Sequence, residues 1–169
     1  MLKSLIYLFC WTLIPGLELR ASIPVGILTP SFAEQVSWPL VVVFCWFANV
    51  LIGWVFFALL RPLELVIRKV SFVNTLFTKY LERAREKLRP GLEKYGIWGF
   101  ALFIGIPLPL TGAYTGAAGA YALGMKKHDF IIANVIGVTI AAIAVTVVVL
   151  LIRAGIESPL FELLIKRQQ

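Results

Sequence analysis

The sequence predicts an all-α integral membrane protein with two inverted repeats, each a re-entrant helical hairpin followed by one transmembrane helix. The composition is 60% hydrophobic and the mean hydropathy is +0.89. Two long runs, 38–60 and 130–152, carry no charge, and two shorter apolar pairs are interrupted by proline. Soluble domains contain about 45–50% apolar residues. We therefore expect a multi-pass protein of the cell (inner) membrane.

The uncharged runs 38–60 and 130–152 each contain 23 residues. An α-helix rises about 1.5 Å per residue, so either run is long enough to cross a hydrocarbon core of about 30 Å. The sequence therefore predicts one transmembrane helix in each run.

A shorter apolar pair precedes each run. The first hairpin is expected at 2–28, around the break PGLELR, and the second at 97–125, around the break PLPLTG. Apolar segments of about 10–14 residues are often re-entrant, and proline interrupts a helix. One kinked spanning helix for each pair is the alternative. The expected breaks are marked by four prolines: Pro15, Pro24, Pro107 and Pro109.

A shift of 92 residues lays IPGLELRA at 14–21 over IPLPLTGA at 106–113, and Trp38 over Phe130. A re-entrant hairpin crosses the membrane zero times and a helix crosses it once. The second repeat is therefore expected upside down relative to the first. Inverted repeats whose broken helices meet near the midplane are typical of secondary transporters.

Repeat one is expected at 1–61 and repeat two at 96–153, followed by a C-terminal tail at 154–169. Between the repeats, 62–95 shows apolar residues at helical spacing and charges on the other faces. This pattern predicts an amphipathic helix and linker on the cytoplasmic surface. The helix is expected to begin at Pro62, which suits a first turn, and to end at Pro90.

Basic residues set the expected orientation. The stretch 61–95 and the KKHD turn contain 11 of the 16 Lys and Arg residues, whereas the loop 29–37 contains none. By the positive-inside rule the basic side is cytoplasmic and both termini face outward. The formal charge of +7 is then explained by loops near anionic lipid, and no nucleic-acid partner is expected.

Glu18 and Arg20 lie inside the first hairpin. An ionised group at the bilayer centre costs about 2.5–3.5 kcal/mol on translocon scales, which is tolerable if the group faces protein, water or an opposite charge. Two positions apart, these side chains diverge on an intact helix but can converge in a broken loop. We predict a site in which Arg20 binds an anion and Glu18 exchanges a proton. A neutralised structural pair is the alternative.

The second hairpin has no charge but offers hydroxyls. Thr111, Tyr114 and Thr115 follow its break, and the N-terminus of a half-helix exposes N–H groups to which an anion can dock. We predict that these residues contact substrate. The alternative is that their hydroxyls satisfy the carbonyls of the broken helix.

Small residues recur every four positions after this break. Such a stripe allows close approach between membrane helices. It predicts packing of the second hairpin against the first, or a homodimer seam. The stripe consists of Gly112, Gly116, Ala120 and Gly124.

Motifs for catalysis are missing from the sequence. It has one His, no Gly-x-Ser-x-Gly, no His-Glu-x-x-His, no Cys-x-x-Cys and no phosphate-binding loop. We expect no enzyme activity, cofactor or metal. Cys10 and Cys45 lie in apolar segments, which predicts no disulfide framework. Asn49 and Asn134 lie inside the spans and are expected to bond across helices.

The stretches PGLELRASIPVGI and PLPLTGAYTGAAGAYALGM resemble the small multidrug export protein family, which is related to the DedA-like (VTT domain) membrane proteins. The resemblance covers both motifs, both spans and the basic middle region. It implies paired re-entrant hairpins and proton-coupled movement of lipids such as polyprenyl phosphates. It also implies roles for an acid and an arginine, matched here by Glu18 and Arg20. The second hairpin departs from DedA-like proteins in lacking both.

These inferences predict a secondary transporter or flippase for an amphipathic lipid or polyprenyl phosphate, with membrane lipids and a small amphipathic substrate as its partners. A small proton-coupled exporter of hydrophobic cations is the alternative. A third interpretation is a non-transporting scaffold that uses the small-residue stripe as its oligomer seam.

Overall fold

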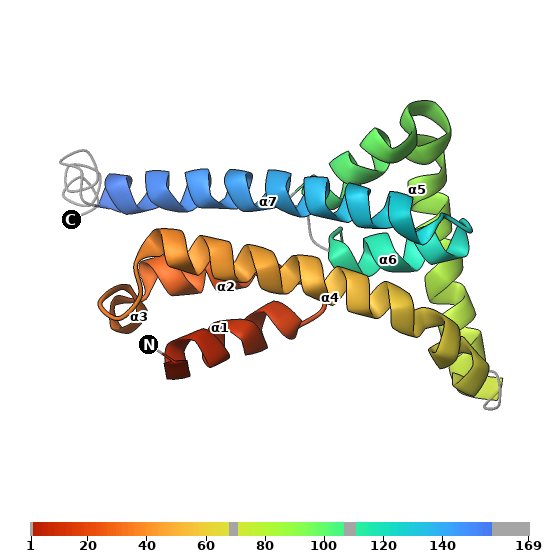
Figure 1. Cartoon of the computed structure of the whole chain (residues 1–169), viewed down its shortest axis with the longest axis horizontal. Helices are drawn as coiled ribbons and strands as arrows, with labels where there is room; N and C mark the ends of the chain where they lie inside the picture. The colour runs from red at the N-terminus through yellow and green to blue at the C-terminus, as the bar shows by residue number, and fades with distance from the viewer. Residues whose placement is uncertain (1, 68–70, 107–110, 157–169) are drawn as a thin grey trace, which may run out of the picture.

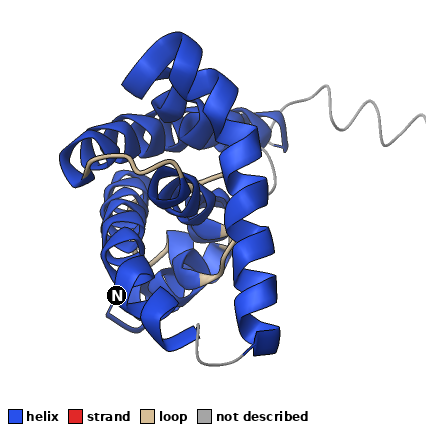
Figure 2. Cartoon of the chain, turned by 90° about the vertical axis from the view of Figure 1, so that its right-hand side faces the viewer, coloured by secondary structure: helices blue, strands red, loops and turns tan. Residues whose placement is uncertain are grey.

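A computed structural model describes residues 2–67, 71–106 and 111–156, and every regular element in these ranges is a helix. Figure 2 views the molecule from the end that carries α5 and shows helices joined by loops. The predicted all-α class is confirmed for the described residues. The helices are α1 (Leu2–Leu13), α2 (Glu18–Leu28), α3 (Pro30–Ala33), α4 (Trp38–Ile67), α5 (Ser71–Gly105), α6 (Ala113–Ala122) and α7 (Lys127–Ile156).

Two helices are long and apolar enough to cross a membrane. They are Trp38–Glu64 of α4, with a mean hydropathy of 2.4, and Lys127–Gly155 of α7, with a mean hydropathy of 3.0. Large apolar side chains stay exposed along both, such as Phe47 and Leu151. Both helices extend beyond the predicted bounds of 38–60 and 130–152, because a charged side chain at a membrane edge can remain in helical backbone while its head reaches water.

The first predicted hairpin is the pair α1 and α2, joined by the turn 14–17. Figure 1 shows α1 running from the left of the molecule to its middle and α2 returning to the left. Pro15 and Gly16 (φ 85°) lie in the turn. The prediction of a break at Pro24 is wrong, because this residue lies inside α2. It removes one backbone hydrogen bond, and packing against α1, α4 and α7 keeps the helix intact.

Helix α5 differs most from the prediction of a separate amphipathic helix within 62–95. Pro62 lies inside α4 and Pro90 lies inside α5. The direction of α5 changes instead at Gly96 (φ 58°, ψ −139°). Each proline removes a single hydrogen bond, whereas the conformation at Gly96 is one that glycine adopts far more easily than other residues. In Figure 1 the first part of α5 lies across the right-hand end of α4 and α7.

The second predicted hairpin, 97–125, consists of the end of α5 and the whole of α6. The predicted breaks Pro107 and Pro109 lie outside the described residues. Helix α6 begins near the middle of the molecule and runs to the right in Figure 1. It packs against α4 and α5.

The first half of the chain carries α1, α2 and the one-turn α3 before the long α4, and the second half carries the end of α5 beyond Gly96 and α6 before the long α7. The core joins both halves, with Leu19 and Ile23 of α2 in one buried cluster with Phe100, Ala117 and Phe130. Both α2 and α6 pack against α4 and α7. This packing brings the first turns of α2 and α6 together in the middle of the molecule.

Candidate functional site

Glu18, the first residue of α2, is only 2% exposed. Its Oε2 accepts a hydrogen bond from the backbone N–H of Ala113 at 3.0 Å, and its Oε1 accepts one from Tyr114 at 3.3 Å. These N–H groups open α6. A helix N-terminus leaves its first N–H groups without helical partners and carries partial positive charge. Glu18 of the first hairpin therefore caps the helix of the second.

Arg20 contacts the other side of the same break. Its Nη2 donates to the carbonyl oxygens of Ile104 at 3.1 Å and Ile106 at 3.0 Å, and to Oγ1 of Thr111 at 3.2 Å. The carbonyls at a helix C-terminus carry partial negative charge, which a cation complements. The two charges of the first hairpin thus match the two helix ends of the second.

The acid and the base also approach each other. Nη1 of Arg20 lies 3.8 Å from Oε2 of Glu18, and the side chains are 12% and 2% exposed. We expected an irregular loop to bring them together, but both residues belong to α2. They converge because Glu18 has a φ of 50°, a left-handed conformation that costs about 1–2 kcal/mol outside glycine. The contacts with α6 and Arg20 offset this cost.

Arg20 has hydrogen-bonding capacity left over. Its Nε and Nη1 are buried and have no hydrogen-bond partner in the part of the chain that the structure describes. A buried donor without a partner costs about 1–3 kcal/mol, and more if it is charged. The guanidinium therefore keeps donor capacity that no described residue uses.

Two of the predicted substrate-binding hydroxyls lie beside this break and bond to backbone. Thr111 Oγ1 donates to the carbonyl of Ile106 at 2.8 Å. The Tyr114 hydroxyl donates to the carbonyl of Leu13 at 2.8 Å, and the Tyr114 ring packs edge-on against Phe56. These contacts correspond to the alternative in which hydroxyls satisfy broken-helix carbonyls. Contact with substrate stays a prediction.

The third predicted hydroxyl, Thr115, interacts with the Tyr80 side chain of α5. Burial raises the pKa of Tyr80, and the hydrogen bond with Thr115 acts in the opposite direction. This contact links α6 to the part of α5 that precedes the bend at Gly96.

Gly112 makes the close approach of the charged pair possible. A Cβ at this position would lie 2.5 Å from Nη1 of Arg20 and 2.6 Å from Oε2 of Glu18. The residue also has a φ of 155° and a ψ of −168°, a region that is essentially restricted to glycine. Any side chain here would therefore displace the guanidinium, the carboxylate or both.

The rest of the small-residue stripe divides into two groups. A Cβ on Gly116 would lie 2.7 Å from Cγ1 of Ile104, and Ala120 is fully buried, so both positions serve close packing within the molecule. Gly124 does not: nothing lies within 4 Å of its Cβ position, and its φ of 68° forms the turn that follows α6. Glycine is favoured at position 124 because the backbone there is left-handed, a conformation that glycine adopts easily.

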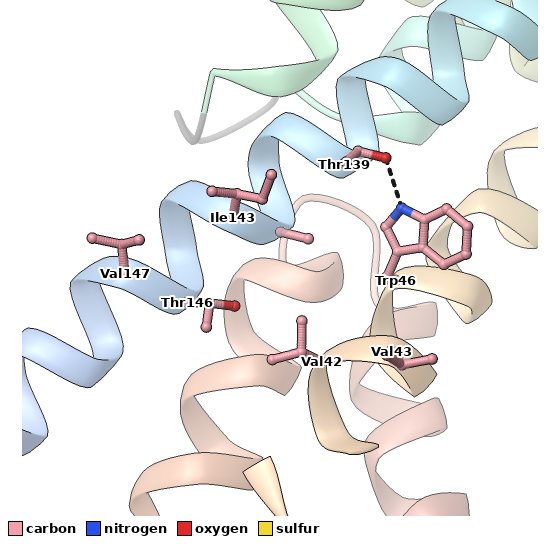
Figure 3. Close-up of a pocket in the computed structure, with 8 residues that line it drawn as sticks. Val42, Val43, Trp46, Thr139, Ile143, Thr146 and Val147 are labelled. Carbon is pink, nitrogen blue, oxygen red and sulfur yellow. Dashed lines mark hydrogen bonds between the residues drawn. The ribbon is translucent and has the colours of Figure 1, made fainter. Parts of the chain in front are cut away.

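An apolar groove between α4 and α7 was missed in the sequence. Its volume is about 350 Å³, and its walls include Trp46, Thr139, Ile143 and Thr146. Figure 3 shows the Trp46 ring reaching from α4 toward α7, where Nε1 donates to Oγ1 of Thr139 at 2.9 Å. The Thr and Trp side chains inside the two uncharged runs were the sequence signal for this groove. They did not suffice to predict it, because the groove forms only when α4 and α7 pack side by side.

Polar residues inside the spans agree in part with expectation. Nδ2 of Asn134 donates to the carbonyl of Val50 at 3.1 Å, which confirms a bond across α7 and α4. Oδ1 of the buried Asn49 has no partner in the described chain. The described residues contain no group of three or more His, Cys, Asp or Glu side chains placed to hold a metal ion.

Two helices that are long and apolar enough to cross a membrane, with large apolar side chains exposed along them, support the class of membrane proteins. The family described as "Putative small multi-drug export protein" matches residues 18–144, from the buried Glu18 into α7. The chain belongs to this family. A search of curated proteins and a search of solved structures each found no match.

Proposed function

We propose that this protein is a secondary exporter of small amphipathic compounds, with hydrophobic cations as the first substrate class. Family membership supports export, and a sequence without a phosphate-binding loop favours coupling to an ion gradient. The observation that carries this proposal is the buried Glu18–Arg20 pair, which joins the two hairpins inside a core whose other buried polar side chains, among the described residues, are uncharged. Ionisable groups that face the interior of a membrane protein mark substrate and ion pathways.

The proposal includes inverted repeats with re-entrant hairpins in a multi-pass protein of the inner membrane. Figure 1 supports this arrangement, because the α1–α2 pair turns back in the middle from the left, whereas α6 leaves the middle toward the right. Helices α4 and α7 are then the two spans. The basic α5 lies on the cytoplasmic side by the positive-inside rule.

Proton coupling follows from the contacts of Glu18. When ionised, the Glu18 carboxylate accepts hydrogen bonds from the backbone N–H groups of Ala113 and Tyr114 and lies close to the Arg20 guanidinium. Protonation removes the negative charge from the positive end of α6 and from the guanidinium, which weakens the link between the hairpins. The two halves then rock about this junction, as inverted-repeat transporters do. This scheme needs neither a cofactor nor enzyme chemistry.

The groove between α4 and α7 is the proposed site for the apolar part of the substrate. Its volume of about 350 Å³ lies in the range of about 300–1,000 Å³ that is usual for ligand pockets. Trp46 lies in its wall, and the face of a tryptophan ring attracts organic cations. This combination favours a hydrophobic cation.

A lipid or polyprenyl phosphate is the second candidate substrate. The observation that favours it is the pair of unpartnered buried nitrogens on Arg20, Nε and Nη1, because a guanidinium binds phosphate well. The occupied N-terminus of α6 works against it, since Glu18 already fills the place where the phosphate was expected.

Reconstitution into vesicles with an imposed pH gradient tests both candidates. We expect the wild-type protein to move ethidium, and Glu18→Gln to abolish pH-driven movement, while the exposed control Glu93→Gln leaves it unchanged. Full pH-driven transport by Glu18→Gln would contradict the coupling role. Movement of a fluorescent polyprenyl phosphate without ethidium movement, lost in Arg20→Ala, would establish the second candidate instead.

A further inference from the structure

A second cavity, whose wall is partly polar, lies between α4, α6 and α7. Its volume is about 510 Å³, and its wall includes Phe57, Arg61, Tyr121, Met125 and Lys127. We call it the basic pocket. No residue of the Glu18–Arg20 pair or of the α4–α7 groove lines it, so it is separate from the proposed export site.

The basic pocket lies at one end of the apolar parts of the long helices. Arg61 directly follows the uncharged run 38–60, and Lys127 is the first residue of α7. In Figure 1 this is the right-hand end of the molecule, where the first part of α5 also lies. The basic residues of α5 assign that end to the cytoplasm. The pocket is therefore at the depth of the lipid headgroups.

Both cations of the pocket are free to bind an anion. Arg61 and Lys127 are exposed, and neither forms an ion pair within the described ranges. Nζ of Lys127 lies 5.3 Å from the centre of the Trp54 ring, which holds the ammonium at the pocket edge. The neighbouring acid, Glu64, accepts a hydrogen bond from the Tyr121 hydroxyl.

The remaining wall is apolar and well packed. The Phe57 ring stacks on Phe130 with centroids 4.6 Å apart and meets Tyr121 edge-on at 6.4 Å. Met125 completes this side of the pocket. A ligand that fits must therefore combine negative charge with an apolar portion.

We propose that the basic pocket binds the phosphate-bearing headgroup of an anionic phospholipid from the cytoplasmic leaflet. Arg61 and Lys127 contact the phosphate, and the Phe57 wall contacts the start of the acyl chains. Basic pockets between transmembrane helices on the cytoplasmic side are suited to such headgroups. A soluble phosphate shares the charge, but the apolar wall adds affinity for a lipid alone.

Native mass spectrometry of the full chain in detergent tests this proposal. We expect dioleoylphosphatidylglycerol to bind at least about tenfold more tightly than dioleoylphosphatidylcholine. The Arg61→Gln/Lys127→Gln variant is expected to lose about 10- to 30-fold in phosphatidylglycerol affinity, since each cation near a membrane surface contributes measurably to anionic-lipid binding. Millimolar inorganic phosphate is expected to leave the bound lipid in place.

Lys79→Gln/Arg83→Gln is the matched control, because it removes two exposed cations from α5 outside the pocket. It is expected to keep the wild-type affinity, as is the charge-preserving variant Arg61→Lys/Lys127→Arg. An equal loss in the α5 control, unchanged affinity in the pocket variant, or displacement of the lipid by phosphate would overturn the proposal. If the double variant does not fold, single Arg61→Gln and Lys127→Gln variants each test for a loss of about fivefold.

Discussion

The two hairpins share one architecture but differ in how their breaks are stabilised. In the first, the turn closes on itself, because the N–H groups of Leu17 and Glu18 both donate to the carbonyl of Ile14. In the second, the N–H groups that open α6 and two carbonyls at the end of α5 bond to Glu18 and Arg20 of the first hairpin. The second hairpin therefore depends on the first.

This asymmetry explains why only one hairpin carries charge. A broken helix buried in a membrane protein must have its terminal backbone groups satisfied. One acid and one base, placed two residues apart on α2, satisfy both ends of the break in the other hairpin. In the first hairpin the turn backbone bonds mostly to itself, and the second hairpin contributes an uncharged contact there, from the Tyr114 hydroxyl to the carbonyl of Leu13.

Removing the acid should have the largest effect on stability. Glu18→Ala leaves the N–H groups of α6 and the Arg20 guanidinium without their anion, and breaking a buried ion pair costs about 3–5 kcal/mol. Thermal unfolding in detergent measures the loss. Glu93→Ala, which removes an acid paired with Arg89 on the exposed surface, should change the unfolding temperature little. Equal unfolding of both variants would contradict the dependence of one hairpin on the other.

Filling the space beside the pair should come second. In Gly112→Ala the new methyl group meets Nη1 of Arg20 and Oε2 of Glu18, and the backbone conformation adds strain, for a loss of about 2–4 kcal/mol. Gly124→Ala is the control, because its Cβ position is open and only the left-handed backbone costs energy, about 1–2 kcal/mol. Denaturation of both variants in the same detergent measures their losses in unfolding free energy. Equal losses would mean that the Glu18–Arg20 pair tolerates displacement.

An overpacking change where the first hairpin contacts α4 should cost less. A Cβ on Gly26 would lie 2.5 Å from Cγ1 of Val41 and 3.2 Å from Cδ2 of Leu8. Gly26→Ala is therefore expected to lose about 1–3 kcal/mol, and adding Val41→Ala should restore part of it. Because the hairpin junction is untouched, pH-driven transport should persist. Loss of transport at unchanged stability would show that the first hairpin also moves internally.

The smallest expected effect lies in the contact between the two long helices. Trp46→Phe removes the hydrogen bond to Thr139 and should cost about 0.5–1.5 kcal/mol. A double-mutant cycle with Thr139→Val isolates that bond. Trp98→Phe, at a side chain that is 67% exposed, serves as the control. A coupling energy near zero would show that α4 and α7 pair through apolar packing alone.

Much of this architecture could be predicted because hydrophobic run length is a strong signal in membrane proteins. The two long helices, the short pair at 2–28 and the turn at Pro15 follow from uncharged runs and proline. The helix bounds near Pro62, Pro90 and Pro24 could not be predicted, because tertiary packing lets a helix continue through one missing hydrogen bond.

The chemistry of the pair was only half visible in the sequence. A buried acid and base mark a special position, and the proline break, not their spacing, suggested that the two side chains meet. Their partners at Ala113 and Ile104 lie more than 80 residues away along the chain, and only the packing of α2 against the second half brings them together. The left-handed backbone of Glu18 has no sequence signature, because glutamate, unlike aspartate or asparagine, is not enriched in that conformation.

Site-directed cysteine labelling from each side of the membrane tests most directly whether the hairpins enter from opposite faces and meet at the charged pair. In a background with Cys10 and Cys45 replaced by serine, cysteines at Lys3 and Phe32 flank the first hairpin, and cysteines at Lys94 and Lys126 flank the second. The account predicts labelling of the first two from the outside and of the second two from the cytoplasm. If the cysteines at positions 3 and 32, or those at positions 94 and 126, are labelled from opposite sides of the membrane, the re-entrant arrangement is contradicted.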